Sequence, residues 1–171
     1  VGAATLDNIN RLKLLDKDDL TREIGFSFGA KTIMITFHPA TNEHSSAEKQ
    51  FRELLCALDE FPDIHMIFTK SNADADGRII GAMIDEYVSK NITRSAAYTS
   101  LGHLRYLSAM RHVLGVVGNS SSGLIEAPSF KIGTVNIGDR QKGRVRGGSV
   151  IDCEPIREKI IDALNLYLIH I

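Results

Sequence analysis

The second half of the sequence contains Val113-Leu-Gly-Val-Val-Gly-Asn-Ser-Ser-Ser-Gly123, the most informative segment for the fold class. Residues 113–117 are apolar and rich in valine, which is typical of a buried strand. Residues 118–123 form a turn of glycine and serine, and a short helix is expected over 121–127. An apolar strand that runs directly into a polar, glycine-bounded turn and a helix is the basic unit of an α/β sheet.

The same alternation of strand and helix extends in both directions from this stretch. It predicts an α/β fold, in which a Rossmann-like parallel sheet carries helices on both faces. Pro155 is expected in the first turn of the last helix. Strands are expected at 32–37, 64–69, 96–99, 113–117, 134–137 and 149–153, and helices at 46–60, 77–90, 101–112, 121–127 and 155–169.

Length and composition limit the classes of protein to which this chain can belong. Its 171 residues suffice for one compact domain, 1–171, and a hydrophobic content of 43% is ordinary for a soluble globular protein. A net charge of −1 gives no indication of nucleic acid or of a membrane surface as a partner. Cys56 and Cys153 match no metal-binding spacing, which favours free thiols in a reducing cytoplasm. The first residue is Val1, so we expect a segment of a longer chain.

The turn at 118–123 is the strongest candidate for an anion site. Gly118 permits a close approach of the backbone, while Ser120 and Ser121 add hydroxyl donors at the start of a helix. Unpaired N–H groups at a helix N-terminus favour phosphate. The alternative is a serine that caps a short helix without any ligand. The turn is neither a GxGxxG motif nor a P-loop.

Polar residues also follow the other predicted strands. Glu126 could accept hydrogen bonds from ribose hydroxyls, or it could be a helix charge without a ligand. His38 directly follows a strand and could bind a phosphate or transfer a proton. Arg140, with Arg144 and Arg146, could clamp a diphosphate or lie in a solvated loop. These residues follow the carboxyl ends of the predicted parallel strands, where ligands bind in open α/β sheets.

The loop that contains Asn72 resembles a metal loop at first sight, with the sequence Asn72-Ala-Asp-Ala-Asp-Gly77. It lacks the distal glutamate of an EF-hand, so we expect a capping turn and no metal site. Asn72 could then face the ligand crevice.

Taken together, the motifs resemble the C-terminal half of the UDP-N-acetylglucosamine 2-epimerases, and most closely the hydrolysing branch that makes N-acetylmannosamine for sialic acid biosynthesis. The resemblance covers nearly the whole chain. It is carried by Thr36-Phe-His-Pro39, Phe68-Thr-Lys-Ser-Asn-Ala-Asp74, Gly118-Asn-Ser-Ser-Ser-Gly123 with Glu126, and Asn136-Ile-Gly-Asp-Arg-Gln-Lys-Gly-Arg144.

This resemblance implies a C-terminal lobe of the two-lobed GT-B architecture, with residues 1–31 as the inter-lobe linker and a leading helix. Ser120 and Ser121 would bind the diphosphate of UDP and Glu126 its ribose. The implied roles of the other site residues are positions near the nucleotide for Asn72, Gly118 and Arg140, and at the phosphate–sugar junction for His38.

The implied reaction eliminates UDP from UDP-N-acetylglucosamine and then adds water to the 2-acetamidoglucal intermediate, without a metal or another cofactor. The family's acid and base residues belong to an N-terminal lobe that these 171 residues lack. We therefore expect this segment to bind UDP weakly without turnover. The full-length protein is expected to be a cytoplasmic homo-oligomer. Three alternatives stay open: a non-hydrolysing epimerase, a GT-B glycosyltransferase and a non-catalytic nucleotide-binding domain.

Overall fold

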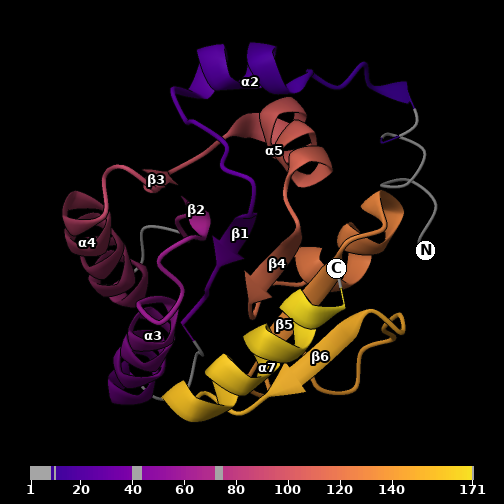
Figure 1. The fold of residues 1–171 in the computed structure, drawn as a ribbon. Coiled ribbons are helices and arrows are strands. Elements are labelled where there is room, and N and C mark those ends of the chain that lie inside the picture. The colour runs from indigo at the N-terminus through magenta and orange to yellow at the C-terminus, as the bar shows by residue number, and fades with distance from the viewer. Residues whose placement is uncertain (1–8, 10, 40–43, 72–74, 171) are drawn as a thin grey trace.

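A computed structural model describes residues 9, 11–39, 44–71 and 75–170 (Figure 1). Within them, six strands form one parallel sheet in the order β3-β2-β1-β4-β5-β6. This is the strand order of a Rossmann sheet, so the predicted fold class is confirmed. The strands are β1 (Thr32–Thr36), β2 (His65–Thr69), β3 (Ser95–Tyr98), β4 (Gly115–Gly118), β5 (Gly133–Ile137) and β6 (Val150–Cys153).

Helices cover both faces of the sheet. On one face α3 (His44–Leu58) packs between α4 (Ala75–Lys90) and α7 (Arg157–Ile169), and the opposite face carries α2 (Lys17–Ile24) against α5 (Gly102–His112). Two short elements follow β4: α6 (Ser122–Ile125) and the 3-10 helix η1 (Ala127–Phe130). The helices cover the faces of the sheet, so the edge at the carboxyl ends of the strands is formed by the connecting loops.

The alternation of side chains along β1 explains why both faces are apolar. Ile33 and Ile35 lie in the core beneath α3, α4 and α7, whereas Met34 lies in the core beneath α2 and α5. All three side chains are at most 1% exposed. Because successive side chains of a strand point to opposite faces, a strand covered on both sides must be apolar throughout.

Strands β1 and β4 are neighbours at the centre of the sheet, where the strand order reverses. β1 is followed by α3 on one face, whereas β4 is preceded by α5 on the other. Their last residues, Thr36 and Gly118, are paired in register, so the loops that leave them start side by side. Ligands of open α/β sheets bind at such a switch point.

Two details differ from the sequence-based expectation. The helix expected over 121–127 is interrupted after Ile125, because Pro128 has no N–H to continue the helical hydrogen bonds, and η1 takes its place. Pro155 lies outside the last helix, which begins at Arg157. As the first residue of this helix, Arg157 has no partner for its N–H within the helix, and this N–H donates to Oε2 of Glu53 on α3, at 2.7 Å.

Candidate functional site

Gly118 shapes the turn of residues 118–123, called the Gly118 turn below. Its φ of 139° lies in a region that side chains with a Cβ rarely adopt. A Cβ at this position would lie 1.9 Å from the carbonyl oxygen of Thr36 on β1. The Asn119 N–H then donates to that same carbonyl, at 3.2 Å. The turn therefore requires glycine at its first position, because a Cβ there would clash with the main chain at the end of β1.

Asn119 connects the Gly118 turn to the exit of β1. Its Oδ1 accepts a hydrogen bond from the His38 N–H at 2.7 Å, and its Nδ2 donates to the His38 carbonyl at 2.8 Å. The residue is only 3% exposed. The structure thus brings the main chain of His38, a predicted site residue, next to the turn.

The loop after β5 reaches the same point. Nη1 of Arg140 and Nε2 of Gln141 both donate to the Asn119 carbonyl, at 3.2 and 2.8 Å. Gln141 is 1% exposed, and its Oε1 is buried without a hydrogen-bond partner. Burial and the neighbouring Arg144 lower the pKa of Arg140 from its ordinary value. Arg140 therefore lies at the turn, on the side of the β5 loop.

Ser120 and Ser121, the predicted phosphate ligands of the turn, lie at the start of the short helix α6. Ser120 is buried and its Oγ accepts a hydrogen bond from the Ser122 N–H at 3.3 Å. Ser121 is the N-cap of α6, and its side chain makes no capping hydrogen bond. Because α6 has four residues, its dipole is small, and attraction for an anion would come from local N–H and hydroxyl groups.

Glu126 ends α6 with a half-buried carboxyl group. Its Oε2 is buried without a hydrogen-bond partner, and burial raises the pKa of this carboxyl above its ordinary value. The Ser122 hydroxyl and the charge of His103 oppose the shift. A buried acceptor without a donor is destabilising unless something supplies the donor, so Glu126 can accept a hydrogen bond from a hydroxyl group.

Behind α6 lies the phenol of Tyr106 on α5. Burial raises its pKa to about 12, with the hydroxyls of Ser122 and Thr36 opposing the shift. Its hydroxyl makes no hydrogen bond of ordinary geometry in the described residues. Tyr106 therefore fills the space beneath α6 and stays protonated at neutral pH.

The structure separates the three arginines of the β5–β6 loop. Arg146 pairs with Asp152 on β6, whose Oδ1 also accepts from Nδ2 of Asn136 at 2.8 Å. Arg144 is exposed in the loop. Arg140 is the arginine that donates a hydrogen bond to the Gly118 turn.

Asn72 lies outside the described residues, so its predicted role is not tested by the structure. The residues before it, Lys70 and Ser71, line a groove of about 300 Å³ beside the start of α4. Lys70 pairs there with Asp85 at 2.6 Å. The groove lies at the end of β2, two strands from the Gly118 turn.

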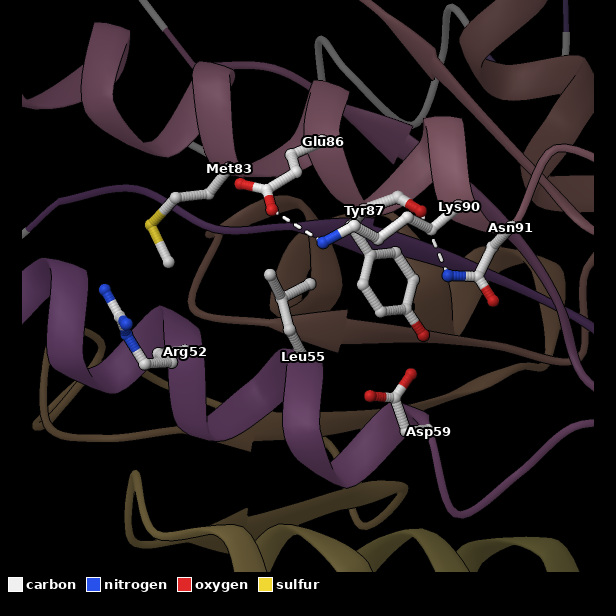
Figure 2. Close-up of a pocket in the computed structure, with 8 residues that line it drawn as sticks. All are labelled: Arg52, Leu55, Asp59, Met83, Glu86, Tyr87, Lys90 and Asn91. Carbon is white, nitrogen blue, oxygen red and sulfur yellow. Dashed lines mark hydrogen bonds and ion pairs between the residues drawn. The ribbon is translucent and has the colours of Figure 1, made fainter.

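A larger groove of about 380 Å³ runs between α3 and α4 (Figure 2). Tyr87 and Leu55 form its apolar part, and the ion pair of Glu86 with Lys90, at 2.7 Å, lies along the α4 side. None of its lining residues comes from the Gly118 turn. This groove is therefore separate from the candidate site.

The described residues contain no group of three His, Cys, Asp or Glu side chains able to hold a metal ion. Over the same ranges, no helix is long and apolar enough to cross a membrane. The arrangement at the ends of β1, β4 and β5 offers cationic and hydroxyl donors from Arg140, Ser120 and Ser121, and a carboxylate acceptor from Glu126. Such a set can hold a phosphate and a vicinal diol, which is what a nucleoside diphosphate presents.

Sequence reasoning missed Asn119 and Gln141, which hold the loops together. The polar side chain of Asn119 within the turn was a signal, but the sequence does not show that its amide faces His38. For Gln141, which lies in a basic run, no signal indicated burial. The contacts of both residues depend on how three strands align in the sheet.

Comparison with known proteins gives one family. The family described as UDP-N-acetylglucosamine 2-epimerase matches residues 1–170. Polysialic acid biosynthesis protein P7 of Escherichia coli is 38% identical over 97% of this chain and 42% of its own. A Campylobacter jejuni protein named GDP/UDP-N,N'-diacetylbacillosamine 2-epimerase (hydrolyzing) is 37% identical over 90% of this chain and 40% of its own. The chain thus spans about two fifths of the length of these relatives.

Solved structures show the same fold. The UDP-N-acetylglucosamine 2-epimerase of Methanocaldococcus jannaschii superposes with a TM-score of 0.69 at 15% identity, over 95% of this chain and 45% of that one. The Neisseria meningitidis enzyme bound to UDP-N-acetylglucosamine gives a TM-score of 0.66 at 16% identity, over 97% and 42%. In both, the shared fold makes up less than half of the solved chain.

Proposed function

Because the chain belongs to the UDP-N-acetylglucosamine 2-epimerase family, we propose that it is the UDP-binding, C-terminal lobe of a hydrolysing 2-epimerase of nucleotide sugars. Domain 1–171 would form this lobe, with residues 1–31 as linker and leading helix. The observation that carries the proposal is the meeting of His38, Asn119 and Arg140 at the central switch point, beside the serines of the Gly118 turn.

The proposed roles follow from the chemistry of each group. Ser120, Ser121 and Arg140 bind the diphosphate, and Oε2 of Glu126, which has no hydrogen-bond partner in the structure, accepts from the ribose hydroxyls. His38 lies at the junction of phosphate and sugar. Asn72 completes the nucleotide site from the loop after β2.

The proposed reaction uses these residues to hold a leaving group. A base removes the C2 proton of the sugar, the C1–O bond breaks, and its electron pair stays on the β-phosphate of UDP. Water then adds to the 2-acetamidoglucal, its hydroxyl at C1 and a proton at C2 on the opposite face, so that free sugar of inverted configuration leaves. Arg140 and the turn donors stabilise the charge that develops on the phosphate. The base and the acid belong to the N-terminal lobe in this proposal, so the present segment alone has no turnover.

Two observations bear on the sugar. Identity to the Campylobacter diacetylbacillosamine enzyme is 37%, whereas the Neisseria meningitidis UDP-N-acetylglucosamine 2-epimerase is 26% identical. A nucleotide-linked N,N'-diacetylbacillosamine is therefore a second candidate substrate beside UDP-N-acetylglucosamine. The likeness to protein P7, at 38%, supports a place in sialic acid biosynthesis.

Two free cysteines, Cys56 and Cys153, support a reducing, cytoplasmic location, and we propose a homo-oligomer for the full-length enzyme.

The test uses the full-length protein in D₂O enriched in ¹⁸O. Each nucleotide sugar is incubated in turn and the products are followed by NMR and mass spectrometry. We expect free 2-epimerised sugar with deuterium at C2, and UDP without ¹⁸O, because the C1–O bond breaks. Release of a UDP-linked epimer would identify a non-hydrolysing epimerase. UDP release only on addition of a sugar acceptor would identify a glycosyltransferase, and no turnover under any condition would favour a non-catalytic nucleotide-binding domain.

A further inference from the structure

We propose that Asn119 is a positioning residue that fixes the spacing of the three loops of the UDP site. This inference rests on the proposed function and deepens it. The three loops leave β1 at His38, β4 at the Gly118 turn, and β5 at Arg140 and Gln141. Asn119 hydrogen-bonds to both of the other loops.

The side chain of Asn119 forms one half of this connection. Its Oδ1 accepts from the His38 N–H at 2.7 Å and its Nδ2 donates to the His38 carbonyl at 2.8 Å. A short amide has both an acceptor and a donor on one rigid plane. An aspartate would place a second acceptor against the His38 carbonyl, and an alanine would leave both main-chain groups of His38 without this partner.

The main chain of Asn119 forms the other half. Its carbonyl accepts from Nε2 of Gln141 at 2.8 Å and from Nη1 of Arg140 at 3.2 Å. Gln141 is 1% exposed, so its bond is shielded from water and from competition by it. One residue thus uses its amide toward β1 and its carbonyl toward β5.

The consequence concerns the diphosphate. Ser120 follows Asn119 directly, and Arg140 donates to the Asn119 carbonyl, so the donors from two loops hold a fixed spacing before ligand arrives. Fixed donors lose less conformational entropy on binding than mobile ones. Loss of the Asn119 amide releases the turn from the His38 loop and so loosens the position of Asn119, to which Ser120 and Arg140 are both connected. It should therefore weaken recognition of the diphosphate more than recognition of the nucleoside.

The test compares Asn119→Ala and Gln141→Met with the control Asn91→Ala in the 171-residue chain. Asn91 also uses its amide to bond a main-chain carbonyl, that of Tyr87 at 3.0 Å, but it lies at the end of α4. The affinities for UDP and for uridine are measured by ligand-observed NMR. Amide hydrogen exchange at His38 reports on the side-chain half of the connection without any ligand.

We expect Asn119→Ala to weaken UDP binding by about tenfold and uridine binding by less than about threefold. The ratio of UDP affinity to uridine affinity should therefore fall. The His38 amide should exchange faster in this variant. Gln141→Met keeps a side chain of similar volume but removes the Nε2 donor to the Asn119 carbonyl. The ratio of UDP affinity to uridine affinity should therefore fall, while amide exchange at His38 stays unchanged. Asn91→Ala should leave the ratio and the exchange at His38 as in the wild type.

The outcomes are distinguishable. Absence of UDP binding by the wild type would overturn both the proposed function and this inference. UDP binding by the wild type with an unchanged ratio in Asn119→Ala would overturn the inference alone. An equal loss of affinity for UDP and uridine in Asn119→Ala, or the same loss in Asn91→Ala, would show that Asn119 has only a structural role and would overturn the inference. If Asn119→Ala does not fold, an unchanged ratio in Gln141→Met overturns the inference.

Discussion

The substitution Gly118→Ala places a methyl group where the structure has no space for one. The new Cβ would lie 1.9 Å from the Thr36 carbonyl oxygen, far inside van der Waals contact, at a φ of 139°. Strain in a disfavoured backbone region costs about 1–3 kcal/mol, and overpacking adds a similar amount. We therefore expect a loss of about 4 kcal/mol in the free energy of unfolding. For a chain of this size that corresponds to a fall in Tm of about 10 °C.

Two matched variants separate the contributions. Gly143 has a φ of 81° with nothing within 4 Å of the position that a Cβ would take, so Gly143→Ala should lose only about 1–2 kcal/mol through its backbone. Gly148 has neither feature, so Gly148→Ala should be neutral or slightly stabilising. Urea unfolding of all three variants, followed by circular dichroism, gives the free energies directly. If Gly118→Ala lowers the free energy of unfolding by no more than Gly143→Ala does, the Thr36 carbonyl does not exclude a Cβ at position 118 as described.

Three further predictions concern Glu126 and Arg140 of the site and Tyr167, which lies at the opposite end of the sheet, where β4 and β5 begin. Because burial raises the pKa of Glu126 above its ordinary 4.5, the folded protein keeps this proton to a higher pH than the unfolded chain, and stability falls as the pH rises through that range. Glu126→Gln should flatten this fall, and urea unfolding across about pH 4–8 measures it. Tyr167→Phe removes the hydroxyl that bonds the Gly133 N–H at 3.0 Å and the Leu114 carbonyl, and should cost about 1–3 kcal/mol in thermal unfolding without a change in UDP affinity. Arg140→Ala should weaken UDP binding by about tenfold in calorimetry, and the paired Arg146→Ala by less than about threefold; equal losses would contradict the assignment of Arg140.

The fold was predictable because it depends on local patterns. Alternating apolar strands and helices predicted all six strands of the sheet, with no end displaced by more than two residues. The leading helix within 1–31 is present as α2. The helix over 121–127 was predicted wrongly in its second half, because Pro128 interrupts α6 after Ile125 and η1 follows.

The site was predictable only in part. Gly118, Ser120, Ser121, Glu126 and Arg140 could be named as candidates because glycine, hydroxyl and charged residues at strand exits indicate a ligand site, and their binding roles stay predictions. The connection through Asn119 could not be predicted, because its hydrogen bonds join residues 81 and 22 positions apart in the chain. Such bonds depend on the order and register of the strands, which local patterns do not determine.

In the proposed function the Gly118 turn and Glu126 hold UDP, and titration of the 171-residue chain with UDP by calorimetry measures this binding. The variants are Ser121→Ala, whose hydroxyl makes no capping bond for α6, and Glu126→Ala, whose Oε2 has no partner. We expect the wild type to bind UDP, and each variant to bind it about tenfold more weakly because a hydrogen bond to a charged group is lost. Unchanged affinity in both variants, or no binding by the folded wild type, would contradict the account.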